Sequence, residues 1–259
     1  MRLKSLDNTL NNERTGNSRN FYTLTMNTFD TKAHANLLAE WAQRSPHAEQ
    51  AFYPDGVIEP EKWANAPIKI LFLNKEAHDS NNPDTEGFDL TRLIREKMEF
   101  KSYRSTYRNT AVWAYAIHKA VMTGSAGLPR WDKILDSVND EVENSFHSCA
   151  IVNIKKSGGV SISIDSDLEK YVELDKDLLR RQIDLINPDL IIAGSVWSLV
   201  KDLWPDCEEL FDAVHQHRDT VIIDFWHPAN RADEQMKYYA LDSFLRNSGI
   251  LSKFRNVIV

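Results

Sequence analysis

The chain has 259 residues and a composition, 42% hydrophobic and 27% charged, that is typical of soluble globular proteins and excludes a disordered or fibrous class. This length suits one sizeable domain, which we expect at residues 29–259, after a polar, Asn-rich arm at residues 1–28. The formal net charge of −7 argues against broad binding to polyanions, because non-specific affinity for nucleic acid comes from Lys and Arg.

The sequence predicts neither a membrane partner nor a cofactor. No apolar run approaches the roughly 20 residues that a transmembrane helix needs, and residues 1–20 lack the apolar core of a signal peptide, so we expect a cytoplasmic protein. Cys149 and Cys207 are the only cysteines, and they lie far apart. This count argues against a disulfide framework, a zinc site and an iron–sulfur cluster.

Predicted helices and strands alternate along the chain. Apolar residues at helical spacing predict the helices, and short apolar, β-branched runs predict the strands. In chain order these are a helix at 31–44, a strand at 68–73, helices at 90–98, 110–122 and 131–146, a strand at 149–154, a helix at 175–186, a strand at 190–193, a helix at 196–203, a strand at 220–225 and a helix at 233–247. The pattern predicts an α/β fold, a three-layer α/β/α sandwich with a central, mostly parallel four-stranded sheet.

Polar residues cluster where the predicted strands end. The clusters are NKEAHDS after the first strand, NIKKSGG at the second, GS after the third and WHPAN after the fourth. Ligands of open parallel sheets bind beyond the carboxyl ends of the strands. The sequence therefore predicts a binding or catalytic site at this edge of the sheet.

These polar clusters do not contain the motifs of several common ligand-binding and catalytic sites. The chain has no GxGxxG or GxxxxGK[ST] motif, and AGSVW does not satisfy GxSxG, so a dinucleotide fold, a P-loop and a nucleophile elbow have no positive support. Gly158-Gly159 could let the backbone approach a phosphate, although an ordinary turn is the favoured interpretation. His215 and His217 could bind a metal, but without a third ligand in register a solvated loop is favoured.

His227 follows an apolar strand, and Pro228 restricts the backbone beyond it. A single His after a strand is more often structural than functional. Asn153 occupies the equivalent position of another strand, and an acidic cluster follows a third. Together these positions favour a functional His at the rim of a site.

The ordered set of motifs resembles the uracil-DNA glycosylase superfamily. In that superfamily the first motif positions or activates water, an Asn reads the base edge, and a His-Pro motif supplies a His to the departing base. The sequence departs from the family pattern in two places, because its first motif lacks the usual Gly and Pro, and Ala229-Asn230 stands where a Ser is common. The motifs compared are LNKEAHDS (73–80), CAIVNIKK (149–156), PDLIIAGS (188–195) and WHPAN (226–230).

The resemblance implies a monofunctional DNA glycosylase that flips a base out of DNA and hydrolyses its N-glycosidic bond, as in base-excision repair. Glu76 or Asp79 would stabilise the sugar cation and act on water, and His227 would donate to the departing base. Asn153, with one acceptor and two donors, would set base identity. Further base contacts are expected from Asn74 and Phe88, and DNA-backbone contacts from Lys155, Lys156, Arg231 and Ser195.

Positive charge is concentrated in residues 92–108, which hold six Lys or Arg against two Glu, with three aromatic residues between them. This run could contact DNA, or it could be a solvated helix face with ordinary i, i+4 ion pairs. Phe88 has a similar alternative, because a core Phe that anchors its loop is as plausible as a base-stacking ring.

The substrate remains open at this level. Uracil and a modified pyrimidine, such as glycosylated hydroxymethylcytosine in phage DNA, are both candidates, and the second would imply a defence role. Two other classes also remain: a nucleotide- or nucleoside-processing enzyme acting on small molecules, and a catalytically silent nucleic-acid- or protein-binding module. A monomer is favoured.

Overall fold

The computed structural model describes residues 29–78, 87–99, 103, 105–135, 139–159 and 163–254. The predicted arm at residues 1–28 and the candidate carboxylate Asp79 lie outside these ranges. None of the helices in the described ranges is long and apolar enough to cross a membrane.

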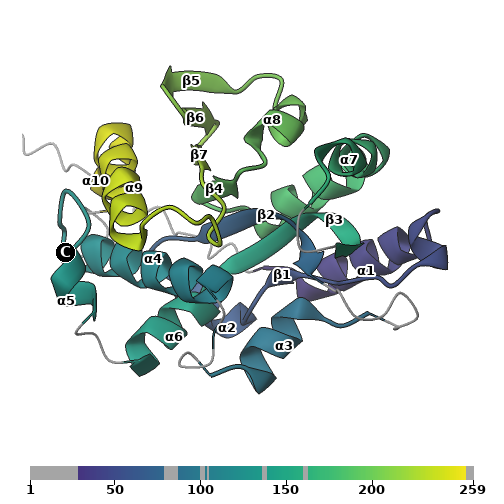
Figure 1. The fold of residues 1–259 in the computed structure, drawn as a ribbon, viewed down its shortest axis with the longest axis horizontal. Coiled ribbons are helices and arrows are strands. Elements are labelled where there is room, and N and C mark those ends of the chain that lie inside the picture. The colour runs from purple at the N-terminus through teal and green to yellow at the C-terminus, as the bar shows by residue number, and fades with distance from the viewer. Residues whose placement is uncertain are drawn as a thin grey trace, which may run out of the picture.

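A seven-stranded mixed sheet forms the centre of the fold, in the order β1-β3-β2-β4-β7-β6-β5 (Figure 1). Neighbouring strands in the run β3-β2-β4-β7 pair in parallel, and β1, β6 and β5 add antiparallel pairs at the two edges. The predicted α/β class is confirmed, whereas the sheet has seven strands in place of the predicted four. The strands are β1 (Gly56–Val57), β2 (Ile70–His78), β3 (Ala150–Gly159), β4 (Leu190–Gly194), β5 (Glu208–Phe211), β6 (Val214–His217) and β7 (Thr220–Phe225).

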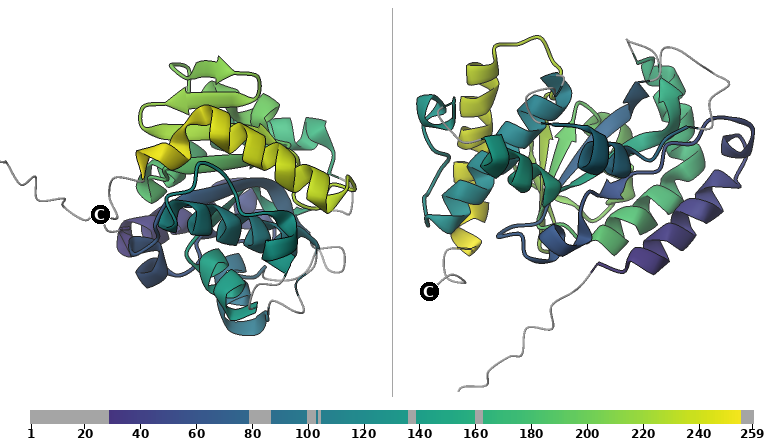
Figure 2. Two further views of the ribbon diagram at one scale, coloured as in Figure 1. Left: turned by 90° about the vertical axis from the view of Figure 1, so that its left-hand side faces the viewer. Right: turned by 90° about the horizontal axis from the view of Figure 1, so that it is seen from below.

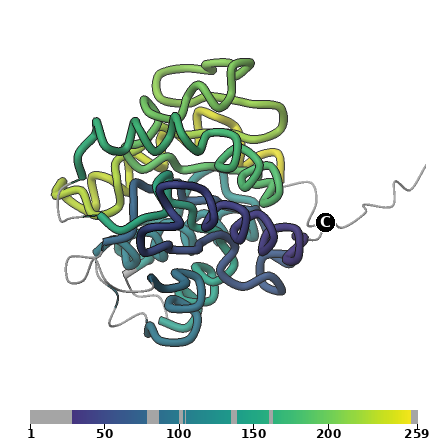
Figure 3. The backbone as a smooth tube through the Cα atoms, turned by 90° about the vertical axis from the view of Figure 1, so that its right-hand side faces the viewer, coloured from purple at the N-terminus to yellow at the C-terminus, as the bar shows by residue number. Residues whose placement is uncertain are grey.

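Helices cover both faces of the sheet (Figure 2). Alternate residues of β2 enter different cores: Ile70 and Phe72 pack on one face, and Leu71 and Leu73 on the other. The first core includes residues from α3 (Leu90–Lys97), α4 (Ser105–Met122), α5 (Trp131–Leu135), α6 (Asn139–His147), α9 (Glu234–Ser248) and α10 (Ile250–Lys253). The second includes residues from α1 (Thr31–Ala42), α2 (Pro60–Ala64), α7 (Asp165–Ile186), α8 (Trp197–Val200) and the 3-10 turn Lys201–Leu203. Helices α1 and α7 lie side by side on the second face (Figure 3).

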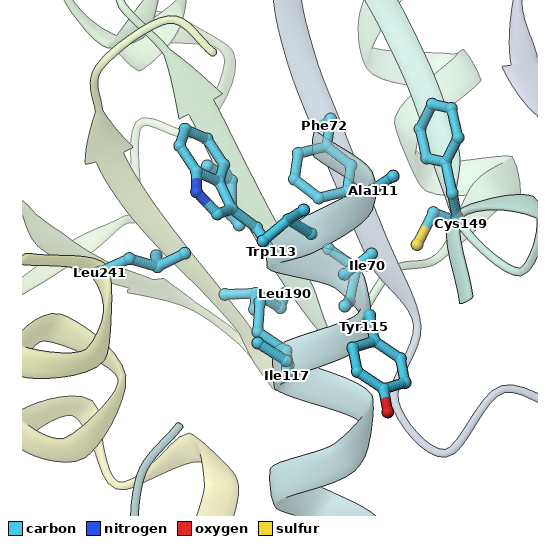
Figure 4. Close-up of a cluster of buried hydrophobic side chains, with 14 of the residues drawn as sticks. Ile70, Phe72, Ala111, Trp113, Tyr115, Ile117, Cys149, Leu190 and Leu241 are labelled. Carbon is cyan, nitrogen blue, oxygen red and sulfur yellow. The ribbon is translucent and has the colours of Figure 1, made fainter. Parts of the chain in front are cut away.

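Helix α4 contributes Ala111, Trp113, Tyr115 and Ile117 to the first core, where they lie near Ile70 and Phe72 of β2 (Figure 4). Trp113 is 2% exposed and stacks edge-on against Phe225 of β7, with ring centroids 5.3 Å apart. On the same helix, His118 is hydrogen-bonded through Nε2 to the Ile68 carbonyl at 3.1 Å. These contacts fix the position of α4 against the parallel strands.

Strands β2 and β3 continue through the polar clusters that the sequence analysis places after them. The predicted strands end at residues 73 and 154, but β2 runs to His78 and β3 to Gly159. Pairing of β2 with β4 stops at Leu73, whereas pairing with β3 continues through Glu76. The β2–β3 pair therefore extends as a two-stranded ribbon beyond the carboxyl ends of β4 and β7.

Other boundaries differ for local reasons. Helix α7 begins at Asp165, earlier than the predicted residue 175, because acidic and exposed residues mask its first apolar positions. The predicted helix at 131–146 is two helices, α5 and α6, and the helix predicted at 196–203 is the short α8 followed by a 3-10 turn. The predicted loop containing His215 and His217 is strand β6. Strand β7 has the predicted boundaries.

Candidate functional site

A cavity of about 830 Å³ lies beside the β2–β3 ribbon, where β4 and β7 end. Its polar side includes Asn74, Glu76, Asn153, Ser195 and His227. Its apolar side, from the connection between β2 and β3, includes Phe88, Leu90, Leu93, Met98 and Tyr107. The same connection also contributes the polar residues Ser105 and Thr106. The structure thus brings six of the predicted site residues to one cavity.

The turn that follows β7 is held by two side chains from helices. Asn109 of α4 donates through Nδ2 to the Pro228 carbonyl at 2.8 Å. Lys237 of α9 donates to the same carbonyl at 3.3 Å and to the Asn230 carbonyl at 2.7 Å. Both side chains are buried, so the turn is fixed to two helices of the first core.

His227 is held as a neutral hydrogen-bond donor. Its backbone N–H donates to Ser195 Oγ at 2.9 Å, and its Nδ1 accepts from the Ala229 N–H at 3.2 Å. Because Nδ1 is an acceptor, the neutral ring has its proton on Nε2. Burial, together with the charges of Lys75 and Lys237, lowers the pKa of His227 to about 4. Near neutral pH the ring therefore offers an N–H without carrying a charge.

Two asparagines stand next to each other on the ribbon. Asn74 and Asn153 are register partners and are 5% and 4% exposed. The backbone N–H of Asn153 donates to the buried Asp55 carboxylate at 2.8 Å, which fixes the strand at this residue. Asn74 Oδ1 has no hydrogen-bond partner within the described part of the chain. A Cβ on Gly194 would lie 2.8 Å from this oxygen, so a larger residue there would displace the Asn74 side chain.

Glu76 is paired with a lysine of the neighbouring strand. Lys155 Nζ lies 2.9 Å from Glu76 Oε2 and 2.7 Å from Asp167 Oδ2 of α7. Burial disfavours the charge of Lys155, but hydrogen bonds to Asp167 and Glu76 outweigh it and raise its pKa. Lys155 is thus a charged group that contacts Glu76 from outside the cavity lining, and its ammonium is already paired with two carboxylates.

Lys156 points to the opposite face of the sheet, as its place next to Lys155 in a strand requires. Its side chain is fully buried, with Nζ 2.5 Å from Asp55 Oδ1 and 4.9 Å from the ring centroid of Trp41. The prediction that Lys156 contacts a DNA backbone is therefore wrong.

The remaining predicted residues are at the surface. Ser195 and Arg231 are exposed, and Ser195 has a left-handed backbone with φ of +57°. Phe88 is 37% exposed and packs edge-on against Tyr53, with ring centroids 4.9 Å apart. The ring of Phe88 is therefore held by Tyr53 and also lines the cavity.

Two arginines of the basic run are paired with a glutamate of the same run. Arg92 lies 2.8 Å from Glu96, and Arg95 contacts the same carboxylate at 3.2 Å and donates to the Ile58 carbonyl at 3.1 Å. This segment fits the solvated-face interpretation, while residues 100–102 and 104 lie outside the described ranges. His217 is 3.1 Å from Asp206, and no group of three or more potential metal ligands occurs in the described ranges.

The sequence analysis missed Asn109 and Lys237, although both had a detectable signal. Each stands in the apolar stripe of its helix: Asn109 is four residues before Trp113, and Lys237 is four residues before Leu241. A polar residue in such a stripe must find a partner inside the protein. Here the partners are the carbonyls of the turn that carries His227.

Comparison with known protein families and with characterised proteins yields no match for this chain.

Proposed function

We propose that the protein is a monofunctional DNA glycosylase with a fold of the uracil-DNA glycosylase type. The observation that carries this proposal is that Glu76, Asn153 and His227, from three separate parts of the chain, line one cavity. They are also the residues that the ordered motifs assign to the sugar, the base edge and the departing base.

The geometry suits cleavage of an N-glycosidic bond. Such cleavage builds positive charge on the sugar and negative charge on the base, so a site needs an anion for the first and a donor for the second. Glu76 supplies the anion, and the Nε2–H of neutral His227 supplies the donor. Asp79, outside the described ranges, stays an alternative for the carboxylate role.

Water is the expected attacking group. A glycosylase that also cuts the strand uses an uncharged amine as its nucleophile. Lys155 is unsuited to that role, because contacts with two carboxylates keep it protonated. This pairing supports simple hydrolysis.

The size of the cavity favours a modified pyrimidine over plain uracil. At about 830 Å³ it lies in the upper part of the ~300–1,000 Å³ range typical of pockets that enclose drug-sized ligands. Asn153 would read the base edge, Phe88 would stack on the ring, and the rest of the apolar side would accommodate a substituent. A base modified in phage DNA would make the protein a defence enzyme.

A small-molecule nucleoside hydrolase is the second candidate, and the internal pairing of Arg92 and Arg95 with Glu96 favours it. Such an enzyme needs no DNA-binding face. Its affinity for oligonucleotides would be weak and its cleavage of free nucleosides efficient.

The test is an alkali-cleavage assay on labelled single- and double-stranded oligonucleotides containing uracil, hypoxanthine, hydroxymethylcytosine or its glucosylated form. We expect alkali-dependent breaks at one base type, slowed about 100-fold or more in His227→Ala. His215→Ala is the matched control, because His215 lies in β6, outside the cavity lining. Absence of breaks with every oligonucleotide, together with cleavage of free nucleosides, would replace the proposal with the second candidate.

A further inference from the structure

We propose that Lys155 is a positioning residue that fixes the Glu76 carboxylate for catalysis, and that it makes no contact with DNA. This inference rests on the proposed function, because it assigns Lys155 to the reaction that Glu76 would serve. It replaces the role that the sequence alone suggests for Lys155.

The ion pair between Glu76 and Lys155 joins two neighbouring strands of the sheet. Glu76 and Lys155 are register partners on β2 and β3, so their backbones are held side by side by strand pairing. Their side chains are only 5% and 8% exposed, and Nζ lies 2.9 Å from Oε2. A pair so enclosed is much less screened by water than a surface salt bridge.

Gly159 closes the space on the other side of Glu76. A Cβ on Gly159 would overlap the carboxyl group of Glu76, so the acidic side chain lies directly against the β3 backbone. The Glu76 carboxyl group, which lines the cavity, is thus in contact with the Lys155 ammonium and next to the Gly159 backbone. An anion held in a fixed place before the reaction is what stabilisation of a sugar cation requires.

Helix α7 holds Lys155 in turn. Asp167, in the first turn of α7, accepts from Lys155 at 2.7 Å, and the ring of Tyr171 lies 4.9 Å from Nζ. The ammonium therefore has contacts on three sides within the protein. A phosphate would have to displace Asp167 to reach it, whereas the contact with Glu76 is already made.

Lys155→Met removes the ammonium and keeps a side chain of similar length. We expect its single-turnover rate to fall about 100-fold, as for a misplaced catalytic group, while the Kd for DNA and its salt dependence stay unchanged. Lys155→Arg, which retains the charge, should restore most of the rate. In a Glu76→Gln background, Lys155→Met should cause no further loss, because the two residues act as one unit.

Lys176→Met is the control, since Lys176 pairs with Glu173 on the surface of α7 and lies outside the cavity lining. A phosphate-contact role for Lys155 would give the opposite result: a weaker Kd, a salt slope reduced by about 0.9, and an unchanged single-turnover rate. That result would overturn the inference while leaving the glycosylase proposal intact.

A crystal structure of Lys155→Met tests the inference independently of activity. We expect the Glu76 carboxylate to leave its position against Gly159. A carboxylate unmoved in the variant would overturn the positioning role. Inactivity of the wild-type protein on every oligonucleotide would instead remove the proposed function, and with it the catalytic purpose of the pair.

Discussion

His227 differs from an ordinary exposed histidine in two ways: its tautomer is fixed, and its pKa is lowered. The Ala229 N–H occupies Nδ1, and burial keeps the ring neutral. A neutral ring can donate to a departing base but cannot protonate it as an acid would near neutral pH. In the proposed reaction the rest of the stabilisation of the base anion would come from the surrounding groups, among which Lys75 also lines the cavity.

The first prediction concerns this titration. Because its pKa in the folded protein is about 4, below the ordinary 6.5, the unfolded chain binds the proton more readily between these values. The contribution of His227 to stability is therefore complete above about pH 6.5 and is lost as the pH falls towards 4. Nitrogen-15 NMR of the imidazole should show a neutral ring with its proton on Nε2 at pH 6. A His227 signal that titrates at pH 6.5 would contradict this.

Lysines 155 and 156 show what the sequence could and could not reveal about the site. The motifs predicted Asn153 and His227 at one site, and both line the cavity, because they lie just beyond the end of the pairing among β2, β4 and β7. The two lysines were given one role because the predicted strand stopped at residue 154. Once β3 is known to continue, alternation places Lys155 on the side of Asn153 and Lys156 on the other.

At the scale of elements, the turn after β7 depends on the start of α4. Asn109 lies near the N-terminal end of α4 and donates to the Pro228 carbonyl, so the helix and the His-Pro turn form one unit. Segments of the same helix also line the cavity, through Tyr107 and its neighbours. The position of His227 is consequently set by a helix from the middle of the chain.

The second prediction follows from this contact. Asn109→Ala removes one of the two donors to the Pro228 carbonyl and should cost about 0.5–1.5 kcal/mol of stability, the net contribution of one hydrogen bond, because Lys237 still donates to that carbonyl. We expect a larger relative fall in the glycosylase rate than in Tm, because the freed turn carries His227. Met122→Ala, at an exposed position of the same helix, is the control. An unchanged rate in Asn109→Ala would show that Lys237 holds the turn alone.

Elements were predictable where the apolar pattern was strong. Strand β7, an apolar run, has the predicted boundaries, and α1 begins at the predicted residue, Thr31, where the Asp30 side chain accepts from the Ala33 N–H at 2.9 Å. Strands β5 and β6 gave no such signal, since Glu208, Glu209 and His215 occupy positions where apolar residues would mark a strand. They form because they add to the edge of a sheet that already exists.

At the scale of the whole molecule, the two faces of the sheet differ in what lies on them. The face covered by α1 and α7 contains a buried polar group, the Asp55–Lys156 pair, whose carboxylate also holds the backbone of Asn153. The cavity opens on the polar end of the other face. The face covered by α1 and α7 therefore supports the ribbon, while the opposite face carries the cavity.

The third prediction concerns the apolar side of the cavity. Leu93→Trp should fill part of the space opposite the polar side without touching Glu76, Asn153 or His227. If the protein prefers a bulky modified pyrimidine, this variant should lose activity on that base at least about tenfold more than on uracil, the scale of discrimination that a change in pocket shape provides. Parallel assays with the two oligonucleotides measure the ratio. An equal loss on both would show that the added space is not used by the base.

The β2–β3 ribbon supplies part of the cavity lining, and the connection between these two strands supplies another part. This division has an evolutionary consequence. The groups proposed to break the bond are anchored in the sheet or at its ends, where a change would disturb register and core together. The apolar side is supplied by a connecting segment, which tolerates substitution far better than a central strand. Related proteins can therefore change which molecules they bind and still keep the same catalytic groups. This is an advantage when the substrate evolves and the bond to be broken stays the same.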